Sequence, residues 1–289
     1  MTNLSGRKLG KVVVTGSAGM LGRELVAAFE GAFEVWGVDL EEMDVTSLGE
    51  TRRVLEQIKP EWIVHAAAYT RVDDAERESL EAHRVNALGT RNVAAISLEL
   101  GSAVLYFSTD YIFDGKSGRP YTEFDIPSPL NEYGRSKLAG ELLLQHLNPR
   151  HLVVRTSWLF GPGGPNFVDT IREKALQGNP LRIVDDQCGS PTYTRDLAQM
   201  SLELVRRDLR GTYHVTNSGC CSWFELAEAI ISSLEQDVPV VPISTSEFPR
   251  PATRPLFSVL ENHMLQVEGI PQLRFWKEAL SEHLRSGRV

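Results

Sequence analysis

The sequence predicts an α/β protein built around a doubly wound parallel sheet. Short apolar segments rich in Val and Ile alternate along the chain with longer segments of helical periodicity. This alternation is typical of parallel strands joined by right-handed helical crossovers. The first apolar segment, residues 11–15, also runs directly into a glycine-rich turn and then into a helical segment. With 289 residues, the chain can bury a sizeable core as one large domain or as a large and a small lobe.

The expected elements follow one another with short connections. The strands are expected at residues 11–15, 34–38, 62–64, 104–107, 153–158 and 211–215. The helices are expected at residues 23–31, from the cap Thr46 or Ser47 to just before Lys59, at about 80–100, from Tyr133 onward, after Asn166 and Phe167 up to Gly178, at 196–206, from Ser222 onward and within 271–284. In the helix from Tyr133, apolar Leu138, Leu142 and Leu143 recur at helical spacing. Ser222 and Glu225 have the spacing of a capping box.

Composition excludes several classes of protein. Hydrophobic residues make up 42% and charged residues 24% of the chain, as in ordinary globular proteins. The formal net charge of −8 argues against nucleic acid or an anionic membrane as the main partner. Cys188, Cys220 and Cys221 are odd in number and lack the spacing of a metal site, which fits a reducing cytoplasm. After the polar segment 1–11, the apolar run 12–14 is too short for a signal peptide or a membrane span.

The first turn predicts a dinucleotide site. Gly16, Gly19 and Gly22, with Met20 and Leu21 between the last two, lie between a strand and a helix. Glycines there allow a tight turn and close approach of the backbone, and the helix N-terminus offers free N–H groups to a pyrophosphate. This places the turn in a Rossmann-like, doubly wound parallel sheet.

Acidic residues near the end of the second strand extend this site. Asp39 lies 23 positions after Gly16, close to the spacing of a carboxylate that binds the cofactor ribose. Asp44 and Val45 follow in the next loop, where they could meet the adenine. Asp44 could equally belong to the cap of the helix that starts at Thr46 or Ser47.

The segment 104–137 predicts the reacting groups. Tyr133 and Lys137 are four residues apart, so on a helix they share one face. A nearby ammonium lowers the pKa of a phenol toward working pH, and a hydroxyl at the strand end, Ser108 or Thr109, could hydrogen-bond a carbonyl oxygen. Taken alone, a Tyr/Lys pair at this spacing is more often a solvated surface pair. The glycine turn upstream favours the catalytic interpretation.

Together these residues resemble an extended short-chain dehydrogenase/reductase. The chain is most similar to the dTDP-4-dehydrorhamnose reductases, through stretches spread in order over most of its length. Those stretches are TGSAGMLGREL, HAAAYTRVDDAE, VNALGTRNVA, STDYIFDG, PYTEFD, PLNEYGRSKLAGE, RTSWLFG, DQCGSPT and RPLFSVL. The resemblance implies a cofactor domain with a smaller C-terminal substrate-binding lobe. It also implies hydride transfer from NADPH or NADH to the 4-keto carbon of a dTDP sugar.

The resemblance assigns roles to individual residues. Tyr133 would protonate the developing alkoxide, and Lys137 would hold the nicotinamide ribose and lower the pKa of Tyr133. Thr109 would polarise the ketone, with Ser108 and Asp110 beside it. The cofactor would pass close to the backbone of a small-residue run, Ala66, Ala67 and Ala68. Asn86 would be structural, in the helix that borders the site. The carboxylate of Asp39 favours NADH, but family members with an acid there are not uniformly NAD-specific, so the choice stays open.

Substrate-binding residues are expected after the fifth strand. They are Trp158, Asn166, Gln187, Arg250 and Arg254. Trp158 could pack its ring on a sugar or base, with core packing as the rival interpretation. Arg250 and Arg254 lie between prolines and could pair with a diphosphate, whereas a solvated surface pair is the alternative.

The domain boundaries and the competing functions complete the prediction. Residues 1–155 are expected to bind NAD(P) and residues 156–289 the nucleotide-sugar substrate, with about 192–216 returning to the first domain. A nucleotide-sugar 4-epimerase or dehydratase would share the Tyr/Lys pair. Dehydratases commonly carry Asp-Glu after the threonine, however, and here Asp110 is followed by Tyr111. A non-catalytic NAD(P)-binding regulatory subunit is the third alternative. The oligomeric state is not fixed by the sequence, and a homodimer is the candidate assembly.

Overall fold

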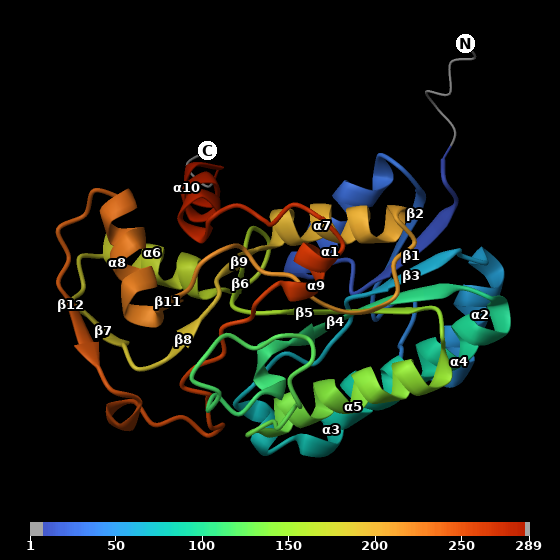
Figure 1. Ribbon diagram of the computed structural model, residues 1–289, viewed down its shortest axis with the longest axis horizontal. Helices are drawn as coiled ribbons and strands as arrows, with labels where there is room; N and C mark the ends of the chain where they lie inside the picture. The colour runs from blue at the N-terminus through green and yellow to red at the C-terminus, as the bar shows by residue number, and fades with distance from the viewer. Residues whose placement is uncertain (1–7, 287–289) are drawn as a thin grey trace, which may run out of the picture.

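A six-stranded parallel sheet forms the centre of the molecule (Figure 1). The computed structural model describes residues 8–286, so most of segment 1–11 and the last three residues lie outside it. The strand order is β2-β1-β3-β4-β5-β10. The strands are β1 (Lys11–Thr15), β2 (Glu34–Val38), β3 (Trp62–His65), β4 (Ala103–Thr109), β5 (His151–Thr156) and β10 (Gly211–His214). The predicted parallel, doubly wound sheet is confirmed, with the chain reversing direction across the sheet between β1 and β3, where ligands of such sheets bind.

Helices cover both faces of this sheet (Figure 1). One face packs on α1 and α7, and the other on α2, α4 and α5, each through its own apolar core. The helices of this part are α1 (Met20–Glu30), α2 (Leu48–Ile58), α3 (Ser79–His83), α4 (Thr90–Leu100), α5 (Glu132–Leu147) and α7 (Thr194–Arg206). Short helical turns lie at η1 (Asp74–Glu76) and η3 (Asp110–Ile112).

A second apolar core, separate from the two cores of the sheet, includes Phe160, Tyr193 and Trp276. It is enclosed by three helices and small strand pairs, β6 with β9, β7 with β12, and β8 with β11. These elements are β6 (Leu159–Phe160), α6 (Phe167–Leu176), β7 (Leu181–Val184), β8 (Cys188–Gly189), β9 (Thr192–Tyr193), β11 (Cys221–Ser222), α8 (Trp223–Ser233), β12 (Val240–Ile243) and α10 (Trp276–Ser286). The short turn η4 (Thr245–Glu247) follows β12, and α9 (His263–Val267) packs on the core of the large sheet through Leu265. The predicted capping box is confirmed at the start of α8, where Ser222 and Glu225 exchange both hydrogen bonds.

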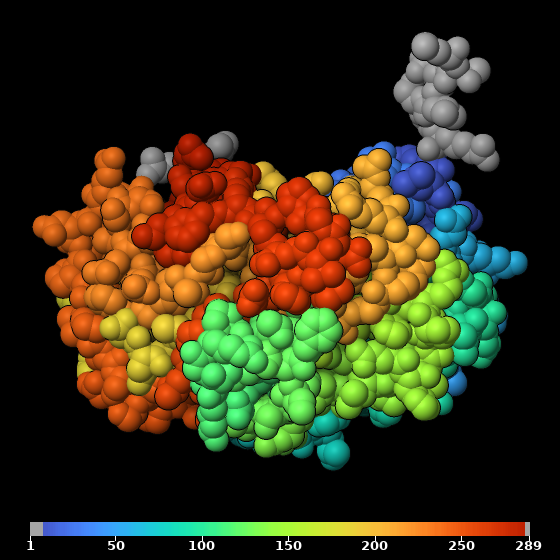
Figure 2. Space-filling model, in the orientation of Figure 1, coloured from blue at the N-terminus to red at the C-terminus, as the bar shows by residue number. Residues whose placement is uncertain are grey.

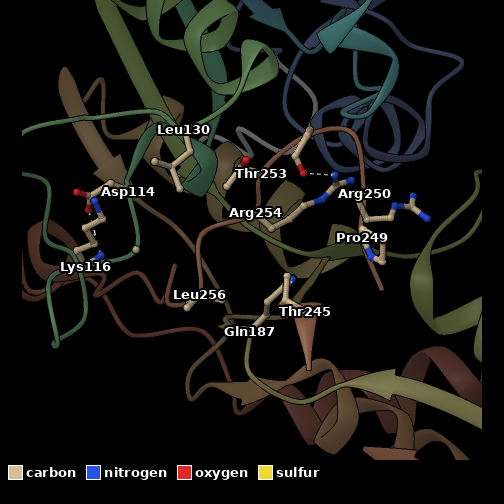
Figure 3. Close-up of a pocket in the computed structure, with 12 residues that line it drawn as sticks. Asp114, Lys116, Leu130, Gln187, Thr245, Pro249, Arg250, Thr253, Arg254 and Leu256 are labelled. Atoms are coloured by element: carbon tan, nitrogen blue, oxygen red, sulfur yellow. Dashed lines mark hydrogen bonds between the residues drawn. The ribbon is translucent and has the colours of Figure 1, made fainter. Parts of the chain in front are cut away.

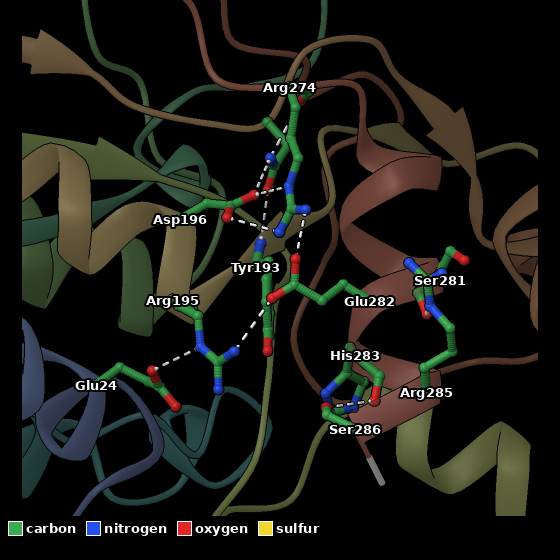
Figure 4. Close-up of polar contacts among 11 residues, drawn as sticks. Glu24, Tyr193, Arg195, Asp196, Arg274, Ser281, Glu282, His283, Arg285 and Ser286 are labelled. Atoms are coloured by element: carbon green, nitrogen blue, oxygen red, sulfur yellow. Dashed lines mark hydrogen bonds and ion pairs between the residues drawn. The ribbon is translucent and has the colours of Figure 1, made fainter. Parts of the chain in front are cut away.

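Ion pairs join helix α10 to the helices of the sheet (Figure 4). Arg195 of α7 lies 3.1 Å from Glu282 of α10 and 3.5 Å from Glu24 of α1. Arg274 bonds Asp196 through two 2.8 Å contacts and also reaches Glu282 at 2.6 Å. Partly exposed pairs are individually weak, but a network of this kind fixes the orientation of α10.

Two long loops meet on one surface of the molecule. The loop after β4 (green in Figure 2) lies against the segment that follows β12. Tyr121 donates its N–H to Val259, and Glu261 donates its N–H to Tyr121, both at 2.8 Å. Segments far apart in the sequence therefore frame the carboxyl end of β4. No helix within residues 8–286 is long and apolar enough to cross a membrane.

Two local predictions differ from the structure. The helical stretch 80–100 is continuous but includes a π-helical segment, η2 (Arg84–Gly89). In α5, Leu142 is exposed, whereas Lys137, Gly140 and Glu141 are buried together with Leu144. A Cβ added at Gly140 would lie 2.4 Å from the carbonyl oxygen of Asn86. This close contact between α5 and η2 leaves room only for a small residue at position 140.

Candidate functional site

The glycine turn after β1 is shaped by close backbone contacts. Gly16 has φ +66°, and a Cβ there would lie 2.7 Å from the backbone nitrogen of Ala67. A Cβ on Gly22 would lie 2.0 Å from the carbonyl oxygen of Gly16. Gly19 precedes α1 without a capping side chain, and the first turn of α1 carries no acidic residue. The N-terminus of α1 therefore offers N–H groups and a positive dipole end to an anion.

Asp39 connects the end of β2 to this turn. Its Oδ2 accepts the N–H of Ala18 at 2.9 Å, and its Oδ1 accepts the N–H of Leu40 at 2.8 Å. Asp44 accepts both the N–H and the hydroxyl of Thr46 at 2.8 Å. These bonds hold the turn just before α2, whose cap is Ser47, and Asp44 also borders the main cleft.

Thr109, Tyr133 and Lys137 converge where β4 ends and α5 begins. Asn131 caps α5 by accepting the N–H of Gly134 at 2.8 Å. The Thr109 hydroxyl accepts the N–H of Tyr111 at 3.2 Å and donates to Asp110 Oδ1 at 3.1 Å. Helix α5 thus presents the predicted Tyr/Lys face to the strand end that carries the predicted threonine.

Burial sets the protonation of this cluster. Burial raises the pKa of Tyr133 to about 12, against a lowering effect of the Thr109 hydroxyl. Burial lowers the pKa of Lys137 to about 7, against a raising effect of Glu141. The predicted lowering of the Tyr133 pKa by Lys137 is not seen in this structure, where burial, Thr109 and Asp110 are the groups that act on the phenol. Burial disfavours the charged forms of both Tyr133 and Lys137.

The Lys137 ammonium is buried and has no hydrogen-bond partner among residues 8–286, although the Lys137 carbonyl oxygen accepts the Tyr106 hydroxyl at 3.2 Å. Its Nζ lies 4.2 Å from the centre of the Tyr106 ring, a cation–π contact. Two further hydroxyls beside it, Ser108 Oγ and Thr156 Oγ1, are also buried without a partner in the described part of the chain. Three hydrogen-bonding groups thus remain available to a ligand at the carboxyl ends of β4 and β5.

Asp110 connects the catalytic strand to the C-terminal segment. It is 2% exposed, and its Oδ2 accepts the Ser258 hydroxyl at 2.5 Å. Burial raises the pKa of Asp110 to about 7, although hydrogen bonds from Ser258 and Thr109 oppose that shift. The resemblance alone gave no sign that Ser258 would reach this position.

Trp158 stacks on a tryptophan that the sequence analysis did not assign to the site. Trp158 has φ +45°, and its ring lies 3.5 Å from that of Trp223 with an interplanar angle of 5°. A Cβ on Gly189 would lie 2.3 Å from the Trp158 ring, so that glycine makes room for it. Both indoles border the cleft. In the sequence, Trp223 stands out only as the residue between Ser222 and Glu225 of the capping box. Its place directly after the cap is the one local sign that it could reach the site.

Most predicted site residues border one cleft of about 920 Å³. They are Gly16, Gly19, Met20, Leu21, Gly22, Asp39, Asp44, Val45, Ala66, Ala67, Ala68, Thr109, Asp110, Tyr133, Lys137 and Trp158. Asn86 lies behind it, where its side chain bonds the backbone of Tyr69 and the Ser136 hydroxyl.

Three predicted substrate residues border a second pocket of about 450 Å³ (Figure 3). They are Gln187, Arg250 and Arg254. Arg254 also interacts with Tyr111, which borders the main cleft, so the two pockets adjoin. Asn166 borders neither pocket. It caps α6, and its amide is held by Gly161, Gly164 and Asp169.

The fold and the cleft define a Rossmann-type protein with the site of an extended short-chain dehydrogenase/reductase. The chain belongs to the family described as RmlD substrate binding domain, whose model matches residues 10–289.

Named relatives and a solved structure agree with this family. The chain is 38% identical to the spore coat polysaccharide biosynthesis protein SpsK of Bacillus subtilis, over 95% of this chain and 97% of that one. It is 37% identical to the dTDP-4-dehydrorhamnose reductase of Aggregatibacter actinomycetemcomitans, over 94% and 97%. The crystal structure of the Bacillus anthracis dTDP-4-dehydrorhamnose reductase in complex with NADP matches with a TM-score of 0.94 and 40% identity, over 97% and 100%.

Proposed function

We propose that the protein uses NADPH or NADH to reduce the 4-keto group of a dTDP-4-keto-6-deoxy sugar, converting dTDP-4-dehydrorhamnose to dTDP-rhamnose. The observation that carries the proposal is that Thr109, Tyr133 and Lys137 share one cleft with the glycine turn 16–22. The relatives named as reductases of such sugars support it.

The residues present fit a nicotinamide dinucleotide. The turn 16–22 carries glycine at three positions and leads into the uncapped N-terminus of α1, whose free N–H groups can bind a pyrophosphate, and Asp39 borders the same cleft. Lys137, Ser108 and Thr156 lack partners among the described residues and would take polar groups of the nicotinamide end. When bound, the reduced cofactor supplies the hydride for the 4-keto carbon. Asp44, Val45 and the alanines 66–68 would line the rest of the cofactor path.

Tyr133 would supply the proton that completes the reduction. Negative charge develops on the ketone oxygen as the carbonyl is reduced, so a donor must lie within hydrogen-bond reach. With its pKa raised to about 12, the Tyr133 phenol holds its proton at neutral pH, which is the state that a donor needs. Thr109 would donate a second hydrogen bond to the oxygen. For that, its proton must turn away from Asp110, which it contacts at 3.1 Å.

The nucleotide end of the substrate would lie toward the C-terminal lobe. Stacked Trp158 and Trp223 offer an aromatic surface to a sugar or base. Arg250 and Arg254 offer guanidinium donors to the diphosphate. Gln187, which donates to Thr245 at 2.9 Å, shapes the same pocket. For Asn166, we propose an indirect role through the start of α6.

A turnover assay tests the proposal. Net oxidation of NADPH in step with loss of a dTDP-4-keto-6-deoxy sugar is expected. Isomerisation or dehydration of a nucleotide sugar without net cofactor consumption would instead identify a 4-epimerase or dehydratase. Binding of NADPH with no turnover of any of these sugars would identify a non-catalytic regulatory subunit.

We also propose which parts of the chain bind the cofactor and the substrate, that the protein forms a homodimer, and that it lies in the cytoplasm. Residues 1–155, with about 192–216, would bind the cofactor, and the rest would bind the sugar nucleotide. Exposed Leu88, Leu98 and Leu142 on neighbouring helical segments support a homodimer, which light scattering tests. Three free cysteines support the cytoplasm.

A further inference from the structure

One carboxylate holds the loop that carries both predicted diphosphate-binding arginines. Asp73, in the connection between β3 and α3, accepts a hydrogen bond from Arg250 Nε at 2.9 Å and forms an ion pair with Arg250 Nη2 at 2.6 Å. It also accepts the N–H of Ala252 at 3.2 Å and a bond from Arg254 Nη1. These partners are 177 to 181 residues away in sequence. Asp73 therefore contacts three alternate residues of one loop with its two oxygens.

The charges of this cluster do not cancel. Burial raises the pKa of Asp73, but bonds from Arg254 and Ala252 outweigh it and lower that pKa to about 2. The carboxylate is thus ionised at neutral pH, and with Arg250 and Arg254 it leaves one net positive charge. Only 14% of the Arg254 side chain is exposed, compared with 49% for Arg250. Arg254 is therefore fixed at the border of the two pockets, whereas Arg250 extends toward solvent.

The same loop is attached to the catalytic helix. Asn131, whose Oδ1 caps α5, donates its Nδ2 to the carbonyl oxygen of Thr253 at 2.8 Å. Thr253 lies between the two residues that Asp73 holds on either side, Ala252 and Arg254. The position of the guanidinium groups is thereby set relative to the helix that carries Tyr133.

We propose that Asp73 is a positioning residue for the substrate: it orients Arg254 and Arg250 to receive the diphosphate while leaving the cluster cationic. This inference rests on the proposed function, because it takes the diphosphate to be the group that those arginines bind. A competing arrangement, in which Asp73 occupies the arginines and must be displaced by the diphosphate, predicts the opposite effect of removing its charge.

The test is inhibition by dTDP, a probe that lacks the reacting sugar. Asp73→Asn is nearly isosteric and removes the charge, so the Ki of dTDP and the KM of the 4-keto sugar nucleotide should rise roughly tenfold or more. The kcat and the Kd of NADPH should stay within about twofold of wild type, since the Asp73 side chain acts only on the arginines proposed to bind the substrate diphosphate. Asp74→Asn is the matched control, because among the described residues the Asp74 side chain pairs only with Arg71, at 3.0 Å and exposed, and the dTDP Ki of this variant should not change.

Two further variants separate the possible failures. Asp73→Glu keeps the charge and moves it by one methylene, so it should fold and bind dTDP with a Ki between those of wild type and Asp73→Asn. Unchanged or tighter dTDP binding in both Asp73 variants, with a raised Ki in Arg254→Ala, would overturn the positioning role and leave the diphosphate site in place. If neither Arg254→Ala nor Arg250→Ala raises the Ki, the proposed diphosphate site fails, and this inference fails with it.

Discussion

Replacing Tyr133 by Phe tests the proposed chemistry most directly. The change removes one oxygen and keeps the ring, which packs edge-on against Tyr111 with centres 6.0 Å apart and planes at 81°. Because the pKa of Tyr133 is about 12, only about one molecule in 10⁵ lacks the phenolic proton at pH 7. The variant therefore removes the donor from essentially the whole population. Loss of a general acid typically costs about 10²–10⁴-fold in rate, or about 2.7–5.4 kcal/mol of transition-state free energy.

The assay is steady-state reduction of a dTDP-4-keto-6-deoxy sugar, with NADPH titrated separately by fluorescence. The kcat should fall by the stated factor, while the Kd of NADPH stays near that of wild type. Tyr213→Phe is the matched control, since it removes another buried phenol oxygen at a strand outside the cleft. A kcat within a few-fold of wild type for Tyr133→Phe would refute the donor role and return the Tyr/Lys pair to a structural one.

Three other predictions concern the cofactor turn and the buried charges. Gly19→Val should stay folded and lose NADPH affinity in a binding titration, since a Cβ at position 19 meets the Gly16 oxygen at 3.2 Å. In Gly22→Ala the added Cβ would lie 2.0 Å from that oxygen, so this variant should also lower the melting temperature. A Gly19→Val protein with wild-type affinity would remove the pyrophosphate assignment. Burial lowers the pKa of Lys137 to about 7 from about 10.5, so between these pH values the unfolded chain holds a proton that the folded protein lacks. The free energy of unfolding should therefore rise with pH across that window in wild type relative to Lys137→Met, and equal slopes in denaturant titrations would contradict the shift. Glu141→Gln should lower the free energy of unfolding in urea by about 3–5 kcal/mol, because it leaves the buried Arg155 guanidinium, 2.8 Å away, without its counter-charge. A decrease below about 1 kcal/mol would mean that Arg155 finds another partner.

Local patterns in the sequence were sufficient to predict the elements and the cofactor end of the site. Strand β1, the turn from Gly16 to Gly22 and the Tyr133–Lys137 pair each depend on residues within one or two turns of chain. Backbone geometry alone then fixes their relative positions, because parallel strands end at one edge of the sheet. The sequence-based boundaries of β1 and β2 therefore match the structure residue for residue.

Contacts between distant segments had no such local signal. Asp73 pairs with a loop about 180 residues later, and Trp158 stacks on Trp223 from a different element. The leucine spacing predicts the helix α5 but not which face of it is buried, because that depends on the neighbouring surface. Here that face meets η2 and the Arg155 side chain, so Gly140 and Glu141 are buried while Leu142 is exposed.

The π-helical turn at Arg84–Gly89 illustrates the same limit. Residues 80–100 have helical composition throughout, and nothing in their periodicity distinguishes a wider turn. In the structure the wider turn includes Asn86, whose amide holds the loop at Tyr69 and also reaches Ser136 on α5. Such turns frequently occur at functional sites, where they re-aim a side chain. Asn86 thus connects the loop after β3 to the helix that carries Tyr133 and Lys137.

The direction of the pKa shifts bears on which reaction the cleft favours. Burial drives Tyr133, Lys137 and Asp110 toward their uncharged forms, with pKa values of about 12, 7 and 7. A reductase requires a protonated phenol at the start of its chemical step, and the cleft provides one at neutral pH. An epimerase or dehydratase first oxidises its sugar, so it needs the same phenol in its deprotonated form as a base. Neutral pH lies about five units below the pKa of that phenol in this cleft. The raised pKa of Tyr133 therefore favours the phenol as a proton donor over the phenolate as a base, and the donor is the form that the proposed reduction uses.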